Sequence, residues 1–91
     1  MPRGNPVVKS LNSTLVVENA NPVPMVFRVE LFSIARSSTV FVREYRAEPF
    51  STLVIGFSKI APAPGDYEAR VYYTFLGVVS GQGARIVVEQ R

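Results

Sequence analysis

A turn rich in proline that leads straight into an alternating segment constrains the fold of this chain most strongly. Residues 61–66 contain two prolines and a glycine, which favour turns for different backbone reasons. From Tyr67 to Phe75, apolar residues occupy every second position, with Glu68, Arg70 and other residues between them. A period of two places the apolar side chains on one face of a β-strand. The segment therefore predicts a turn that enters a central strand of a β-sandwich.

The rest of the chain consists of similar short segments separated by turn residues. The clearest case is residues 25–34, because Met25, Phe27, Val29 and Leu31 fall on one face. No segment of ten or more residues fits the i, i+3, i+4 spacing of a helix better than it fits alternation. We expect strands at residues 6–11, 13–19, 25–34, 39–46, 51–59, 67–75 and 84–89, an irregular stretch at 1–6, and a flexible loop at 77–83, which holds three glycines.

Seven short strands with turn signals between them are typical of an immunoglobulin-like Greek-key sandwich. At 91 residues the chain is long enough for one domain. Its apolar residues are dominated by Val, with Ile, Phe and Tyr, which fit a pleated, half-buried surface. We therefore predict a single all-β domain over residues 1–91, with a partly open barrel of five strands as the alternative.

Three segments carry a resemblance to a known family. Leu15–Asn19, then Phe27–Phe32, then Pro64–Val71 resemble the layout of the CARDB-like domains of bacteria and archaea (cell-adhesion-related domain found in bacteria). Fibronectin type III modules are more distantly similar. The resemblance covers residues 13–89 and implies a surface or secreted protein that acts as a spacer, an adhesion module or an assembly subunit. It favours an extracellular or cell-surface location, although residues 1–6 lack the apolar stretch of a signal peptide.

The residue types leave little for catalysis or for metal binding. The chain has no Cys, His or Trp, so it lacks thiolates, imidazole bases and the usual ligands of transition metals. Asp66 and Glu68 are the nearest approach to a hydrolytic pair, but one falls in a turn and the other on the polar face of a strand. A single Asp is too few for a typical calcium site. We expect a protein that is not an enzyme and that binds no metal or cofactor.

The charges are mixed in sign along the chain. The net charge is +3, from ten basic and seven acidic residues, and bases alternate closely with acids, as at Arg28 and Glu30. Nucleic-acid-binding surfaces usually gather Lys and Arg without acids between them, so this pattern argues against such a partner. The excess of Arg over Lys suits bidentate ion pairs and is compatible with a hot habitat. No apolar run approaches the roughly 20 residues that span a bilayer.

Aromatic side chains that share outward faces with Arg form the predicted interaction surface, because interface cores are enriched in both types. The strand-prone segments near the two chain ends are candidates for exchange with the sheet edge of another copy. Asn12 begins a glycosylation sequon, and Tyr67 sits where a tyrosine corner would brace the preceding connection. The predicted surface comprises Arg28, Phe32, Phe41, Arg43, Tyr45, Arg70 and Tyr72, and the terminal candidates are Val7, Val8, Ile86, Val87 and Val88.

Three functional hypotheses follow from these features. The first is a non-enzymatic module that acts through protein contacts, including self-association as a surface, filament or virion subunit. The second is a small nucleic-acid-binding barrel in which the Arg residues meet phosphates and Phe41, Tyr45 and Tyr72 stack on bases. The third is a carbohydrate-binding sandwich, which the lack of Trp disfavours.

Overall fold

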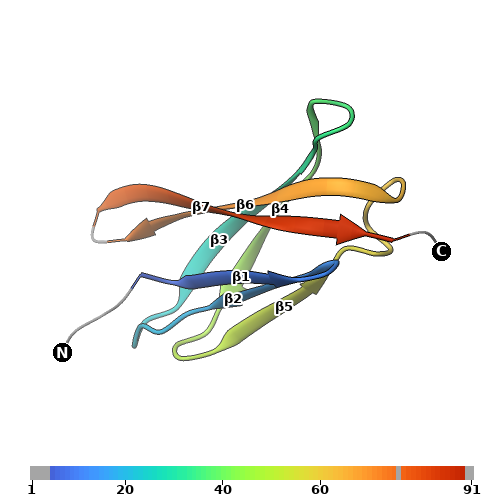
Figure 1. Cartoon of the computed structure of the whole chain (residues 1–91). Coiled ribbons are helices and arrows are strands. Elements are labelled where there is room, and N and C mark those ends of the chain that lie inside the picture. Colours follow the sequence, from blue (N-terminus) through green and yellow to red (C-terminus); the bar gives the residue numbers. More distant parts are fainter. Residues whose placement is uncertain (1–4, 76, 90–91) are drawn as a thin grey trace.

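Two antiparallel sheets packed face to face make up the protein (Figure 1). The computed structural model describes residues 5–75 and 77–89. One sheet has the order β1-β2-β5 and the other β4-β3-β6-β7, and the β2–β3, β4–β5 and β5–β6 connections pass between them. The predicted Greek-key sandwich is therefore confirmed over the five-stranded barrel. The strands are β1 (Val7–Leu11), β2 (Thr14–Glu18), β3 (Met25–Ser33), β4 (Ser38–Ala47), β5 (Thr52–Gly56), β6 (Gly65–Phe75) and β7 (Val78–Val88).

The core lies between the sheets and is built by the predicted alternation. Every second residue of β3 from Met25 to Ser33 is buried, and so is every second residue of β6 from Tyr67 to Tyr73. Phe27 is fully buried, and its ring meets the ring of Tyr73 edge to face with centroids 5.9 Å apart. Such a pair adds about 0.5–1.5 kcal/mol beyond the burial of its area. The described residues include no helix that could cross a membrane.

The loop predicted at residues 77–83 is wrong, because most of this segment belongs to β7. The β6–β7 ladder continues from Gly65 opposite Val88 to Phe75 opposite Val78, which leaves only positions 76 and 77 between the strands. Gly77 has a φ of 77°, a conformation that favours glycine. The hairpin is therefore much longer than the glycines of its second strand suggest.

Two glycines of β7 are covered by side chains of β6. A Cβ atom at Gly81 would lie 3.0 Å from Cδ1 of Tyr72, and a Cβ atom at Gly83 would lie 3.1 Å from Oε2 of Glu68. Glycine in a strand commonly marks a close approach of this kind. Here it lets the β6 side chains lie flat across β7.

The prediction that Phe41, Arg43 and Tyr45 of β4 lie on the outer face with the other surface residues is wrong. Tyr45 pairs with Phe27, and Phe41 pairs with Leu31, so both point inward with their buried partners. The same parity puts Arg43 on the inner side. The register shifts between Leu31 and Phe32 of β3, which leaves Val40 of β4 without a partner as a bulge. Phe41, Arg43 and Tyr45 thus do not share a face with Arg28 and Arg70.

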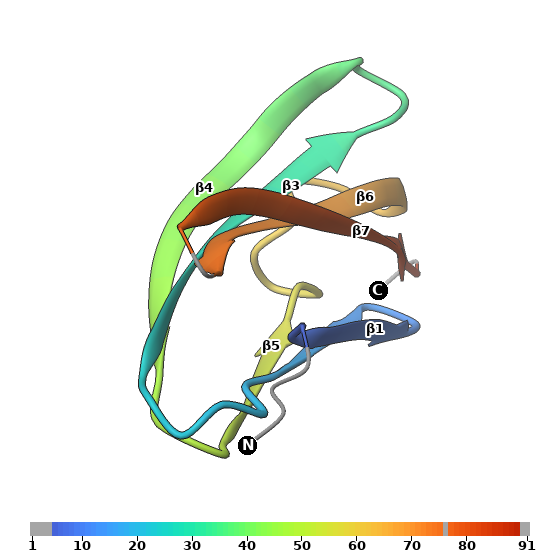
Figure 2. The same ribbon diagram turned by 90° about the vertical axis from the view of Figure 1, so that its left-hand side faces the viewer.

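The two long sides of the sandwich are built differently (Figure 2). On one side β1 and β7 run close together, and the amide of Val87 donates to the carbonyl oxygen of Asn12 at 3.1 Å. On the other side β4 and β5 run apart, and no hydrogen bond joins these two strands among the described residues. The ring of Phe41 on β4 instead meets the ring of Phe57, which directly follows β5, with centroids 5.9 Å apart. We call these the closed side and the open side.

Candidate interaction surfaces

Four of the seven predicted surface residues meet on the outer face of the four-stranded sheet. Arg28 lies opposite Tyr72 across β3 and β6, and Phe32 and Arg70 share their face. The guanidinium carbon of Arg70 lies 4.1 Å from the centroid of the Phe32 ring, within range of a cation–π interaction. These side chains therefore form one connected group, as the alternation of β3 and β6 predicts.

Carboxylates on the same strands neutralise this group. Arg28 pairs with Glu30 at 3.1 Å, and Arg70 pairs with Glu68 at 2.8 Å. Arg46–Glu48 and Arg85–Asp66, both at 2.9 Å, add two further ion pairs among the described residues. The guanidinium groups of the outer face are thus already occupied by acids, which is unlike the unbroken basic surface that nucleic-acid backbones favour.

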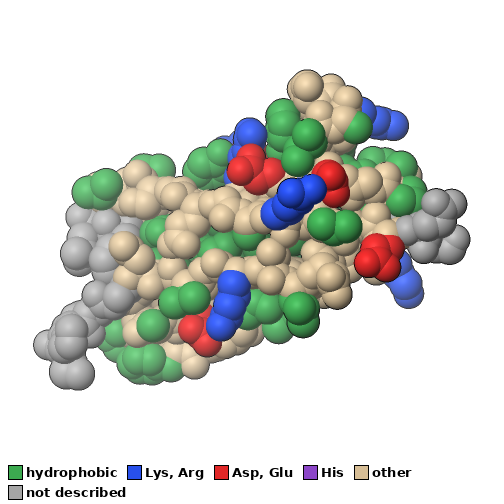
Figure 3. Space-filling model, viewed as in Figure 1, with side chains coloured by type: hydrophobic (Ala, Val, Ile, Leu, Met, Phe, Trp, Pro, Cys, Tyr) green, Lys and Arg blue, Asp and Glu red, His purple; other side chains and the backbone are tan. Residues whose placement is uncertain are grey.

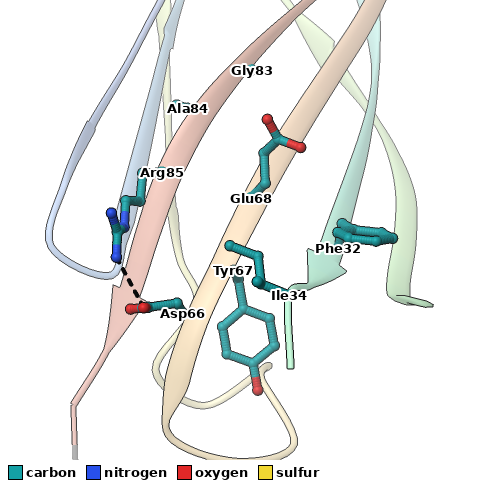
Figure 4. Close-up of a pocket in the computed structure, with 8 residues that line it drawn as sticks. All are labelled: Phe32, Ile34, Asp66, Tyr67, Glu68, Gly83, Ala84 and Arg85. Atoms are coloured by element: carbon teal, nitrogen blue, oxygen red, sulfur yellow. Dashed lines mark hydrogen bonds and ion pairs between the residues drawn. The ribbon is translucent and has the colours of Figure 1, made fainter. Parts of the chain in front are cut away.

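A shallow hollow of about 520 Å³ lies beside this group on the outer face (Figure 4). Figure 4 shows Glu68 on β6 between Phe32 on β3 and Gly83 on β7, with the Asp66–Arg85 ion pair near the end of the strands. Both carboxylates of the hollow are ion-paired. Among the described residues, no three acidic, His or Cys side chains come together as a metal site would require.

Phe41, Arg43 and Tyr45 line the open side instead. Phe41 and Tyr45 are half-buried and pack against the core, and the guanidinium carbon of Arg43 lies 5.8 Å from the centroid of the Tyr45 ring. Arg43 itself is exposed. These three residues therefore form a second group, which is separate from the outer face.

The terminal segments occupy opposite edges of the closed side. Val7 is exposed, Val8 and Val87 are half-buried, and Ile86 and Val88 belong to the core. The side-chain amide of Gln82 on β7 also donates to the carbonyl oxygen of Pro6 at 2.7 Å, which ties β7 to the residue before β1. Exchange of either terminal strand would have to break this side open.

The two remaining predicted residues lie at ordinary surface and bracing positions. Asn12 is exposed in the β1–β2 turn with a φ of 54°, so its sequon is on the surface. The hydroxyl of Tyr67 donates to the carbonyl oxygen of Ala63 at 2.6 Å, which is the contact expected of a tyrosine corner.

One end of the sandwich carries an apolar surface that the sequence did not reveal. The β2–β3, β4–β5 and β6–β7 connections all lie at this end, and hydrophobic side chains are visible there over both sheets (Figures 1 and 3). Phe50 in the β4–β5 connection is 71% exposed, and Val23 in the β2–β3 connection is 56% exposed. Pro22, Pro24 and Pro49 beside them are exposed as well. We call these five residues the apolar end.

Phe50 adopts a backbone conformation that is rare for a bulky residue. Its φ is 54°, in the left-handed region that normally suits Gly, Asn or Asp. Its amide donates to the carbonyl oxygen of Asn21 at 3.2 Å, which fixes one loop of the apolar end to the other. An exposed aromatic residue therefore has an unfavourable backbone conformation beside a backbone hydrogen bond to Asn21, and such conformations concentrate at functional positions.

Two buried asparagines join the loops of the apolar end. Nδ2 of Asn19 donates to the carbonyl oxygens of Val23 at 2.9 Å, Glu48 at 3.1 Å and Ala47 at 3.3 Å. Oδ1 of Asn19 accepts from the amide of Asn21 at 3.0 Å. Both asparagines are 1% exposed. The loops that carry Val23 and Phe50 thus form one rigid unit.

Exposed apolar residues continue from this end toward the β6–β7 hairpin. Val79 is 74% exposed and Val26 is 52% exposed, and with Tyr72 they line a second hollow of about 300 Å³. The only sequence signal for the apolar end was a pair of apolar residues, Val23 and Phe50, beside prolines. The same pattern also occurs where apolar residues pack beneath a turn.

Comparison of the chain with protein-family models, with curated proteins and with solved structures gives no significant match in any of the three.

Proposed function

We propose that this protein is a non-enzymatic interaction module that binds a partner protein at its apolar end. Phe50 is the central contact of the proposed site, with Val23 and the three prolines around it. The observation that carries the proposal is the 71% exposure of Phe50 on loops that are fixed from beneath. Exposed apolar surface of this kind commonly marks protein–protein contacts.

The rigidity of the apolar end supports binding there. A binding site that is already ordered loses less conformational entropy when its partner docks. Asn19 and Asn21 order both loops before any partner arrives. Large aromatic side chains that are held in this way often dominate the binding energy of an interface.

The other two hypotheses have less support from the described residues. A nucleic-acid-binding surface would need several free cations beside exposed stacking rings. Arg28 and Arg70 are ion-paired, and the exposed Arg43 lies over Tyr45, whose ring packs against the core. A carbohydrate site would need an exposed aromatic platform near free polar groups. The polar groups next to Phe50 are already engaged, because the Ser51 hydroxyl donates to the carbonyl oxygen of Glu48 and the Glu48 carboxylate pairs with Arg46.

Photo-crosslinking tests the proposal. Benzoylphenylalanine replaces Phe50 in one variant and Val54 in a control, in cells that naturally produce the protein. Val54 is a matched control because it is 67% exposed and lies on β5, away from the loops. We expect position 50, and not position 54, to give an adduct of one defined mass with a protein.

Competition with unlabelled protein shows whether the adduct is specific. An excess of the unmodified protein should abolish the position-50 adduct, whereas an excess of the Phe50→Ser variant should not. Equal adducts at positions 50 and 54, or competition by Phe50→Ser as efficient as by the unmodified protein, would reject the proposed site. An adduct with nucleic acid would replace it with the second hypothesis.

A further inference from the structure

Strand β4 presents the longest free sheet edge on the open side. It has ten residues, it pairs only with β3, and β5 at the same side has five. Apart from Ala47, whose carbonyl oxygen accepts from Asn19, none of the described β4 residues uses its outer backbone groups to bind another segment. Such an edge is a template for another strand.

The charges along this edge can pair with the same charges on an antiparallel second copy. Glu44 and Arg46 both lie on the outer face, and they are separated by Tyr45, which faces inward. Among the described residues, Glu44 has no ion-pair or hydrogen-bond partner from any side chain. Arg46 is paired with Glu48 at 2.9 Å, but both side chains are well exposed, so this pair holds Arg46 weakly.

We propose that two copies of the chain pair through antiparallel β4 strands, around a two-fold axis that passes beside Tyr45. In this register Glu44 of each copy lies opposite Arg46 of the other, and the two Tyr45 residues face each other. The two four-stranded sheets then form one continuous sheet. The paired residues, 43–47 of each copy, are not residues of the apolar end.

The register follows from two restrictions. Residues that lie opposite each other must point to the same face of the sheet, so only arrangements centred on one residue are allowed. A centre at Arg43, Glu44 or Arg46 would place like charges opposite each other, which is destabilising. A centre at Val42 would require the bulged Val40 to continue the ladder. The arrangement centred on Tyr45 avoids both problems and gains two opposite-charge pairs. Its ladder spans residues 43–47 of each copy, because Glu48 and the residues after it lie outside β4.

Sedimentation equilibrium of four proteins tests the charge pairing. The unmodified protein should dimerise reversibly as its concentration rises. Glu44→Arg and Arg46→Glu each place like charges opposite each other, so each should raise the dimer Kd by about tenfold. The double variant Glu44→Arg/Arg46→Glu restores opposite charges and should return the Kd to within about threefold of the original value.

Matched controls separate this effect from net charge. Glu89→Arg and Arg36→Glu make the same charge changes at exposed positions outside β4, and we expect neither to alter the Kd. A monomer at every concentration in low salt would overturn the proposal. A dimer Kd that is unchanged in both single variants would also overturn it. So would a double variant whose dimer Kd is as high as that of the single variants.

Disulfide trapping tests the register without relying on charge. The chain has no cysteine, so any disulfide must come from an introduced residue. Tyr45→Cys lies at the axis and should form a linked dimer under mild oxidation, whereas Val42→Cys should remain unlinked. Linkage at 42 and not at 45 would contradict the register. Failure of Phe50 crosslinking would leave both results unchanged, so the two proposals can fail separately.

Discussion

The closed and open sides of the sandwich solve the same problem in different ways. Each side has to join the edges of two sheets. The closed side does so along its length, with hydrogen bonds between β7 and the β1 region and with Ile86 and Val88 buried beneath them. The open side is joined mainly at one end, where Asn19 links β2 to the end of β4.

We expect this difference to assign stability mainly to the closed side and association mainly to the open side. Local opening requires less free energy where few buried contacts and few protected hydrogen bonds hold a segment. The open side leaves β4 with a free edge and with half-buried aromatic residues, whereas β7 has its side chains in the core and its edge against β1. We therefore expect substitutions at the closed side to change stability and those at the open side to change association.

Removal of the Asn19 side chain, which joins the connections at one end of the open side, should have the largest effect. Asn19→Ala leaves three carbonyl oxygens and the amide of Asn21 without their partner, so we expect the free energy of unfolding to fall by about 2–4 kcal/mol. Urea denaturation measures the loss. Asn5→Ala, at an exposed position before β1, is the control and should cost less than about 0.5 kcal/mol. An equal loss for both variants would mean that Asn19 does not join the loops.

Two valines on edge strands compare the sides directly. Val88 on the closed side is 2% exposed, and Val88→Ala should cost about 1.5–3 kcal/mol of unfolding free energy. Val40 on the open side is half-buried, and Val40→Ala should cost about 1 kcal/mol or less. Thermal and urea denaturation give both values. Similar costs at the two positions would remove the distinction between the sides.

The hydrogen bonds of Gln82 test how the closed side is held. Its Nε2 donates to the carbonyl oxygen of Pro6 at 2.7 Å and to the hydroxyl of Tyr73 at 2.8 Å. Gln82→Met keeps the size of the side chain and removes both bonds, which should cost about 1–2 kcal/mol. Amide exchange in β1 should become faster while exchange in β5 stays the same. Unchanged exchange in β1 would show that other contacts close this side.

The hydrogen bond of the Tyr67 hydroxyl, which lies away from both sides, gives a reference for the free-energy losses above. Tyr67→Phe removes only the 2.6 Å bond to Ala63 and keeps the buried ring. We expect a loss of about 0.5–1.5 kcal/mol in urea denaturation. A loss well above that of Gln82→Met would mean that the tyrosine corner stabilises more of the fold than its one bond.

Central strands were predictable from the sequence, and edge strands were less so. In β3 and β6 one face is buried and the other is polar, so apolar and polar residues separate cleanly. In β4 the apolar residues lie on both faces, because Val42 at an edge needs no burial while Phe41 does. In β7 the glycines looked like a loop, since the side chains that cover them come from another strand.

The apolar end depends on contacts that no local pattern records. Phe50 is 71% exposed on a loop whose backbone is bonded to Asn21 of a different connection. Arg28, Phe32, Arg70 and Tyr72 could be grouped in advance because period two alone places them on one face. Their neutralisation by Glu30 and Glu68 follows from the same strands, although the geometry of each ion pair required the structure.

Hydrogen exchange at rising protein concentration tests the roles of the two sides most directly. We expect the amides of β4 at residues 43–47, where the two copies pair, to exchange more slowly as the concentration rises, while those of β7, at residues 78–88, keep the same rate. Slower exchange in β7 with no change in β4 would contradict the assignment of the open side as the surface where two copies pair.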